Sequence, residues 1–133
     1  MVSVEFVNIE GRVAHQAGPF PAVRLDGGRL FAGDRQLGAL GGGRWDFGEG
    51  SVTRVRLHGS HCTLRFEGDE DGGADARGPF ERIELVDGAI YAEPGRVLVA
   101  RHVERDGRWH SYNDGRVWPV LVVEWCAEGG GDA

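Results

Sequence analysis

The sequence reads GPFPAVRLDGGRLFA at residues 18–32 and GPFERIELVDGAIYA at residues 78–92. Each stretch starts with Gly-Pro-Phe, continues with apolar residues at alternate positions, and reaches an Asp-Gly pair before a second apolar run. Strand-like alternation on both sides of Asp-Gly is a strong short-range signal for a β-hairpin. The sequence therefore predicts the same hairpin twice, at an offset of 60 residues.

The similarity extends outward from these stretches. The residues that recur identically are Gly18, Pro19, Phe20, Leu25, Gly28 and Ala32, which become Gly78, Pro79, Phe80, Leu85, Gly88 and Ala92. After a small insertion, GGRW at 42–45 matches DGRW at 106–109. An ordered series of matches indicates a tandem duplication. The expected organisation is a single domain over residues 1–126, with repeat 1 at 1–59, repeat 2 at 60–126 and a flexible tail at 127–133.

The predicted fold class is all-β. Short runs rich in β-branched residues alternate with glycine, and no glycine-free stretch keeps a helical period. The best rival for a helix, RVLVARHVERD at 96–106, is rich in valine and is assigned to a strand. The pairs that predict two-residue turns are Asp26-Gly27, Asp87-Gly88, Asp106-Gly107 and Asp114-Gly115.

Large aromatic residues recur in both repeats. The pairs are Phe6 and Phe66, Phe20 and Phe80, Phe31 and Tyr91, and Trp45 and Trp109. Aromatic side chains dominate the energetics of protein cores, so the recurrence predicts repeated core packing. A set of rings that stacks on a ligand is the alternative.

Composition excludes several function classes. The chain has 23 glycines and no lysine, so all 15 basic residues are arginine, which is typical of a G+C-rich bacterial or phage genome. Without lysine there is no Schiff-base chemistry and no P-loop. The net charge of −6 argues against a general nucleic-acid binder, which has to neutralise phosphates.

The N-terminal residues show neither a basic region nor an apolar region of a signal peptide, and no run approaches the length of a membrane span. We therefore expect a cytoplasmic protein in which Cys62 and Cys126 are reduced thiols.

The segment VTRVRLHGSHCTLRFE at 52–67 joins the two repeats. Gly59-Ser60 suits a type II′ turn, which predicts a hairpin with Arg54 opposite Arg65. Facing arginines destabilise a strand pair, so either carboxylates on flanking strands or an external anion should compensate. The candidate anion-binding residues on this face are Arg54, Arg56, His58, His61 and Arg65.

By symmetry, the last strand, VWPVLVVEW at 117–125, is expected to pair with VSVEFV at 2–7. This pairing predicts a pseudo-two-fold closed β-barrel or a tightly closed sandwich, which removes exposed strand edges.

No metal or cofactor is expected. His58, His61 and Cys62 resemble a ligand set, but the hairpin register turns Cys62 to the other face and leaves two ligands where a structural zinc site needs four. The acidic run EGDEDGGAD at 67–75 lacks the spacing of an EF-hand and is interpreted as a solvated loop.

Acid–base residue types occur at His102, Asp106 and His110. A two-residue turn at 106–107 places the two histidines on opposite faces, where they cannot form a dyad. We expect His102 to be a buried histidine with hydrogen-bonded nitrogens. No serine-nucleophile, zincin or dinucleotide motif is present, so no catalytic residue is assigned and a non-enzyme is preferred.

The strand at 117–125 is predicted to be apolar on both sides. Its outward residues, the candidate interface, are Pro119, Leu121, Val123 and Trp125. An exposed apolar patch marks a protein contact, unless a glycine-rich loop at 38–44 or 72–78 covers it.

The preferred function is a non-catalytic cytoplasmic interaction module that binds a protein partner, or itself as a homodimer, through this apolar strand face. One alternative is an anion- or nucleotide-binding protein that uses the arginine face. The other is a small barrel enzyme with a site at the barrel mouth or the repeat seam.

Overall fold

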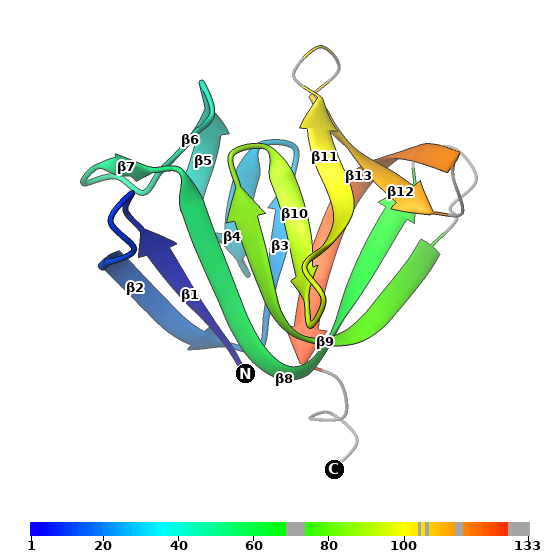
Figure 1. The fold of residues 1–133 in the computed structure, drawn as a ribbon, viewed down its shortest axis with the longest axis horizontal. Helices are drawn as coiled ribbons and strands as arrows, with labels where there is room; N and C mark the ends of the chain where they lie inside the picture. The colour runs from blue at the N-terminus through cyan, green and yellow to red at the C-terminus, as the bar shows by residue number, and fades with distance from the viewer. Residues whose placement is uncertain (69–73, 104, 106, 114–115, 128–133) are drawn as a thin grey trace.

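The structure is a computed structural model. It describes the backbone of residues 1–68, 74–103, 105, 107–113 and 116–127, and the side chains of residues 1–59, 63–65, 78–103, 105, 107–111 and 125. Over this part of the chain the regular structure is entirely β, with no helix, which confirms the predicted fold class (Figure 1).

Thirteen strands follow one another along the described residues. They are β1 (Val2–Val7), β2 (Val13–Phe20), β3 (Ala22–Asp26), β4 (Arg29–Ala32), β5 (Arg35–Gly41), β6 (Arg44–Asp46), β7 (Ser51–Val52), β8 (Arg54–Gly68), β9 (Ala74–Val86), β10 (Ala89–Glu93), β11 (Val97–Val103), β12 (Arg108–Asn113) and β13 (Arg116–Ala127). The helical rival at 96–106 contains β11, so its assignment to a strand is confirmed.

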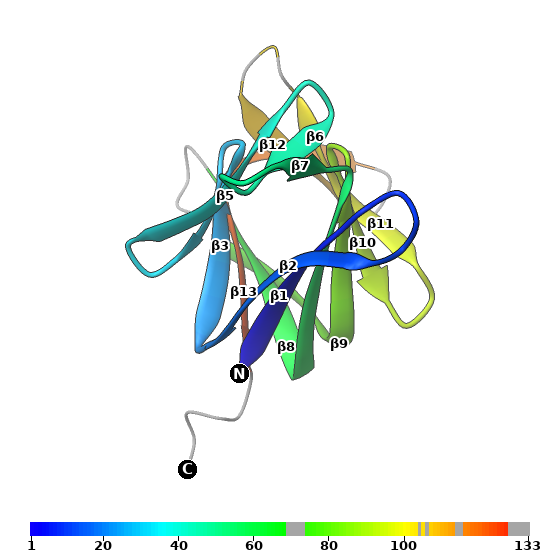
Figure 2. The same cartoon turned by 90° about the vertical axis from the view of Figure 1, so that its left-hand side faces the viewer.

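Antiparallel hydrogen-bonded pairs join the strands in the order β2-β1-β8-β9-β10-β11-β12-β13-β3-β4-β5-β6-β7, and β8 also pairs with β13. β8 and β9 are the longest strands, at 15 and 13 residues, and both bend strongly as they cross the molecule (Figure 1). The β5–β6 and β11–β12 hairpins rise at the same end (Figure 2).

The predicted hairpin at the repeat junction is wrong. β8 continues through Gly59-Ser60 without a turn, and both of its halves pair with β9, with His58 opposite Arg82 and Cys62 opposite Phe80. Because β9 is long enough to satisfy the backbone of both halves, β8 has no need to turn back on itself.

This difference also corrects the predicted facing of two arginines. Arg54 lies opposite Val86, and Arg65 lies opposite Ala76 on β9 and Glu124 on β13. The like-charge pair that was expected to need compensation is therefore not formed.

The predicted pairing of 2–7 with 117–125 is also wrong, and a closed barrel is not found. β1 pairs with β2 and with the first half of β8, while β13 pairs with β12, β3 and the second half of β8. The continuous β8 provides a partner for each strand, which is why they do not pair with each other.

Two of the predicted Asp-Gly turns can be compared with the observed hairpins of the two repeats. Asp87-Gly88 is a two-residue turn between Val86 and Ala89, with Asp87 at a φ of 57°, as predicted. In the first hairpin the turn is shifted by one residue: Asp26 pairs with Arg29, and Gly27 takes the positive φ of 58°.

The predicted register of the β11–β12 hairpin is wrong by two residues, since a two-residue turn would place Val103 opposite His110. His102 lies opposite Trp109, and Val103 lies opposite Arg108. The Gly107 N–H donates to the Val103 carbonyl at 2.9 Å, closing a four-residue loop where a two-residue turn was expected. His102 and His110 still fall on opposite faces, because His110 lies opposite Arg101.

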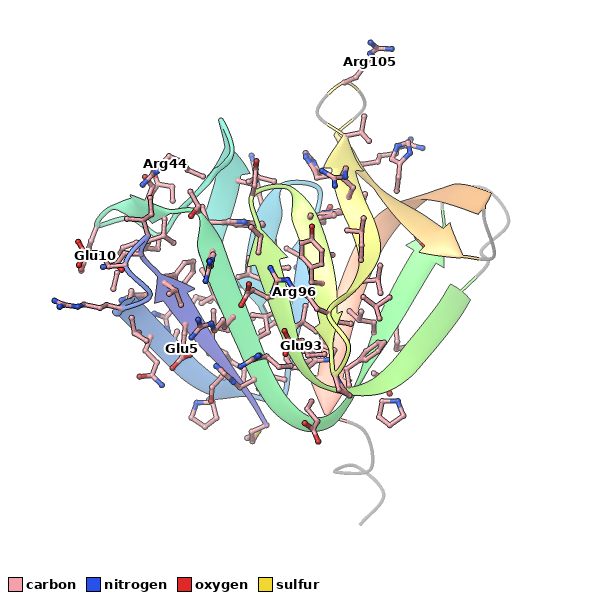
Figure 3. The ribbon with its side chains drawn as sticks, viewed as in Figure 1. Glu5, Glu10, Arg44, Glu93, Arg96 and Arg105 are labelled. Carbon is pink, nitrogen blue, oxygen red and sulfur yellow. The ribbon has the colours of Figure 1, made fainter. Side chains whose placement is uncertain are left out.

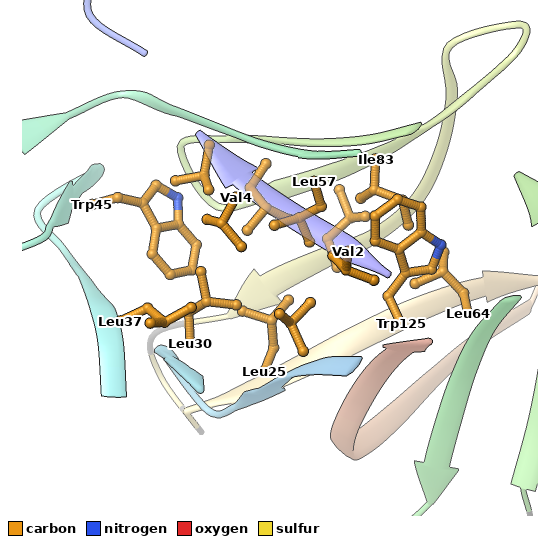
Figure 4. Close-up of a cluster of buried hydrophobic side chains, with 14 of the residues drawn as sticks. Val2, Val4, Leu25, Leu30, Leu37, Trp45, Leu57, Leu64, Ile83 and Trp125 are labelled. Carbon is orange, nitrogen blue, oxygen red and sulfur yellow. The ribbon is translucent and has the colours of Figure 1, made fainter. Parts of the chain in front are cut away.

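The core lies between the curved strands (Figure 4). Phe6, Trp45 and Trp109 are fully buried, as predicted. Phe31 and Tyr91 instead stay half-buried, and each carries an arginine over its ring. A cavity of about 10 Å³ lies within the core, among Leu64, Ile83, Trp125 and their neighbours, and it has room for no more than about one water molecule.

Candidate functional site

Charged residues on four adjacent strands form the most organised surface of the described part of the molecule. Strand register places Glu5 opposite Arg56, Arg56 opposite Glu84, and Glu84 opposite Tyr91. Their neighbours in β1, β8 and β9 point into the core, since side chains alternate along a strand. We call the following set the charged ladder: Glu5, Arg54, Arg56, His58, Arg82, Glu84, Glu93 and Arg96.

The centre of the charged ladder is Glu84, whose side chain is only 5% exposed. Each carboxylate oxygen has its own arginine: Oε2 accepts from Arg56 Nε at 3.4 Å, and Oε1 accepts from Arg96 Nη1 at 3.1 Å. Burial alone would raise the pKa of Glu84, but the hydrogen bond and charge of Arg96, helped by Arg54 and Arg56, hold that pKa below its ordinary value. Glu84 is thus an ionised carboxylate under the guanidinium groups.

Two further pairs flank this centre. His58 Nε2 lies 2.7 Å from Glu5 Oε1, and Arg82 Nη2 donates to Glu93 Oε2 at 2.6 Å. Figure 3 shows Glu5, Glu93 and Arg96 on the same side of the strands. These pairs join β1 to β8 and β9 to β10, so the ladder spans four strands.

Arg96 is held more firmly than a free surface arginine. Its guanidinium carbon lies 4.6 Å from the centre of the Tyr91 ring, and it contacts Glu84 and, at 3.8 Å, Glu93. It also adopts a φ of 48°, which is uncommon for a residue other than glycine. Its side chain is nevertheless 49% exposed, so it can meet a ligand.

The charged ladder has more arginine than carboxylate. It contains four arginines and three glutamates, and the one histidine is already paired with Glu5. Arg54 has no carboxylate within 4.0 Å among the residues whose side chains are described, although it lies close enough to Glu84 to affect its pKa. The surface therefore keeps an unbalanced positive charge at its centre.

The predicted anion-binding residues are only partly brought together. Arg54, Arg56 and His58 lie on the first half of β8 and belong to the ladder. Arg65 is exposed on the second half, which pairs with β13, and the side chain of His61 lies outside the described residues.

Sequence reasoning missed the carboxylates Glu5, Glu84 and Glu93 and the arginines Arg82 and Arg96. The available signal was the alternation in ERIEL at 81–85, which puts Arg82 and Glu84 on one face. Their partners come from β8, β10 and the β10–β11 turn, which only the observed register connects to them.

The interface predicted on β13 needs a correction. Trp125 was expected on the outer face, but it is 1% exposed and packs in the core. It was placed outward by assuming unbroken alternation along 117–125, but the register of β13 against β8 shifts between Val120 and Val122, and Trp125 then lies opposite the buried residues Val23 and Leu64. The side chains of Pro119, Leu121 and Val123 lie outside the described residues, and the alternation that grouped them with Trp125 no longer predicts an exposed patch.

His102 differs from its expected environment. The ring packs on Trp109, with centroids 5.2 Å apart, and lies against Gly28 and Gly88. Both ring nitrogens are buried, yet neither has a hydrogen-bonding partner among the described residues. The predicted hydrogen bonds of the two His102 nitrogens are therefore not formed with any described residue.

Metal-ligating residues do not cluster in the described part of the chain: no group of three or more His, Cys, Asp or Glu side chains is found there. The side chains of His61, Cys62 and the whole acidic run at 67–75 lie outside it.

A comparison with protein-family models, curated proteins and solved structures finds no match to this chain. Among the described residues, no helix has the length and apolar character needed to cross a membrane.

Proposed function

We propose that this protein is a non-catalytic interaction module that binds acidic side chains of a partner protein on the charged ladder. The observation that carries the proposal is the convergence of Arg54, Arg56 and Arg96 on the single buried carboxylate of Glu84. One carboxylate neutralises one of the three guanidinium groups, so the centre attracts further negative charge.

The geometry supports recognition because the arginines are preorganised. A guanidinium has five N–H donors, and Arg56 and Arg96 each use a single donor on Glu84. Fixing a long side chain before binding reduces the conformational entropy lost on association. Arg96 and Arg82 have side chains that are 49% and 37% exposed, and apart from the buried Nε of Arg82 their remaining donors are available for carboxylates of a partner.

We also propose that the fold is a tandem duplication with pseudo-two-fold symmetry. Strand registers support it: β1–β2 places Val4 opposite Ala17, and β8–β9 places Leu64 opposite Arg77, 60 residues on in both cases. A register irregularity falls at Leu30/Phe31 in β4–β5 and 60 residues later at Ile90/Tyr91 in β10–β11.

Reciprocal tryptophan hydrogen bonds support the same proposal. Trp45 Nε1 donates to the Asp87 carbonyl at 3.0 Å, and Trp109 Nε1 donates to the Gly27 carbonyl at 2.6 Å. Each proposed repeat thus contributes a tryptophan that binds the hairpin turn of the other. A symmetric scaffold would leave the outward residues of each half free to diverge, and the charged ladder is one such divergence.

A titration with a hexaglutamate peptide, followed by amide shifts in ¹H–¹⁵N spectra, tests the binding proposal. We expect shift changes on β1, β8, β9 and β10 that weaken with salt, because the attraction is electrostatic. Arg96→Gln should reduce affinity by about tenfold, the loss of a charge-assisted hydrogen bond.

Arg24→Gln is the matched control, since Arg24 lies 4.7 Å from the Phe31 ring centre, much as Arg96 lies over Tyr91, but on β3. It should leave peptide binding unchanged. Shifts confined to other strands, or an equal loss in both variants, would refute the proposal.

A further inference from the structure

The three arginines at the centre of the charged ladder approach Glu84 from two directions. Arg54 and Arg56 are two residues apart on β8 and so share one face. Arg96 comes from the β10–β11 turn and reaches the other carboxylate oxygen. Any group seated over Glu84 would therefore meet guanidinium donors on both sides.

The charges at this point favour a ligand with more than one negative charge. Arg54, Arg56 and Arg96 surround one ionised Glu84, while Glu93 lies 2.6 Å from Arg82 and 3.8 Å from Arg96, and Glu5 is paired with His58 at 2.7 Å. The three arginines thus exceed their shared carboxylate by two positive charges. A phosphate monoester has a charge of about −1.5 to −2 at neutral pH and three acceptor oxygens.

The number of acceptor oxygens also favours a phosphate group as the ligand. A carboxylate has two acceptor oxygens in one plane, whereas a phosphoryl group has three in a tetrahedral arrangement, so that each can face a different guanidinium group. Arg54 has no carboxylate of its own among the described side chains, so it is the donor with most to gain from such a ligand.

We infer that Arg54, Arg56 and Arg96 form a binding site for a phosphate monoester, carried by a phosphorylated side chain of a partner or by a small phosphorylated molecule. This inference rests on the proposed function, because it names the ligand of the same surface. Glu84 acts beneath the site as a positioning residue that holds Arg56 and Arg96 apart and oriented.

The test uses the full chain and four probes at constant ionic strength: inorganic phosphate, acetate, a phosphoserine peptide and the hexaglutamate peptide. Phosphate should shift the side-chain N–H signals of Arg54, Arg56 and Arg96, with an affinity at least about tenfold above that of acetate. Arg54→Gln should remove most of this preference without affecting folding, since it breaks no ion pair with a described side chain. Arg24→Gln is again the control and should change nothing.

Each result separates the two proposals. Equal affinity for phosphate and acetate, or an unchanged preference in Arg54→Gln, would overturn the phosphate site, while binding of hexaglutamate would keep the proposed function. Phosphate preference without hexaglutamate binding would support the site and refute the acidic-segment form of the function. A phosphoserine peptide that binds more tightly than inorganic phosphate would identify a protein source, and equal binding a small molecule.

Discussion

The β8–β9 and β13–β3 strand pairs have the same backbone arrangement and opposite charges. In the first, Arg56 lies opposite Glu84; in the second, Glu124 lies opposite Arg24. The neighbouring strand shows the same reversal of charge in each case. Glu5 of β1 lies opposite Arg56, whereas Arg65 of β8 lies opposite Glu124.

The comparison shows that the inward residues determine the packing of the strands, whereas the outward charges can be exchanged without changing the strand pairing. Inward residues such as Val55, Leu57 and Leu85 build the core whatever charges lie outside. Strand pairing requires only that opposite charges face each other, and it accepts either order. The order found at β8–β9 puts a carboxylate under arginines, and this order makes the charged ladder a candidate for binding anions.

The largest expected change in stability comes from removing the two buried tryptophans, one in each proposed repeat. Trp45→Ala and Trp109→Ala should each lower the free energy of unfolding by about 3–5 kcal/mol, since both side chains are fully buried and both donate a hydrogen bond to a turn. Urea denaturation measures both.

Trp45 and Trp109 lie on β6 and β12, in corresponding places of the two proposed repeats, so if the repeats contribute equally to stability the two losses should agree within about 1 kcal/mol. A loss confined to one tryptophan would show that the two halves of the fold are not equivalent in stability.

A medium effect is expected when the central carboxylate is removed. Glu84→Gln should lower the free energy of unfolding by about 2 kcal/mol, because the 5% exposed carboxylate has charged hydrogen bonds to Arg56 and Arg96. Arg24→Gln, at the corresponding place in β3, should cost less, about 1 kcal/mol, because the half-buried Arg24 donates one hydrogen bond, to the Gly33 carbonyl at 2.6 Å. Similar losses in the two variants would contradict the asymmetry of the two strand pairs.

Acid titration sharpens the same test. The pKa of Glu84 is lower in the folded protein than its ordinary value of 4.5, so its ionised form stabilises the fold above that pH, and the stabilisation is lost as the pH falls through the folded pKa. Between pH values near 5 and 3, Glu84→Gln should therefore lose less stability than the wild type. Parallel pH profiles would mean that Glu84 does not contribute.

Sequence patterns predicted the strands, the second Asp-Gly turn and much of the core, because these depend on local alternation and turn chemistry at residues such as Asp87 and Trp109. They failed at the repeat junction, where Gly59-Ser60 fits a turn equally well but β9 pairs with one continuous strand on both sides of these residues. Only part of the candidate site could be predicted. Glu84 and Arg96 become neighbours of Arg56 through strand pairing that no local sequence pattern indicates.

The smallest expected effect has the opposite sign and compares the β11–β12 hairpin with β5–β6. His102 lies opposite Trp109 as Leu40 lies opposite Trp45, and their backbone N–H groups donate to the carbonyls of Gly88 and Gly28 at 2.7 and 2.6 Å. Leu40 thus shows that an apolar side chain fits this environment.

His102→Leu should raise the free energy of unfolding by about 1–2 kcal/mol, because it removes two buried ring nitrogens that lack partners among the described residues. Urea denaturation at neutral pH measures the gain, and an unchanged dependence on urea would show that the folded state is the same. Leu40→His is the reciprocal variant and should destabilise, since it buries the same polar atoms beside Trp45. A loss of stability in His102→Leu would instead show that the imidazole has a hydrogen-bonding partner in the native protein. His102 would then stabilise the β11–β12 hairpin rather than destabilise it.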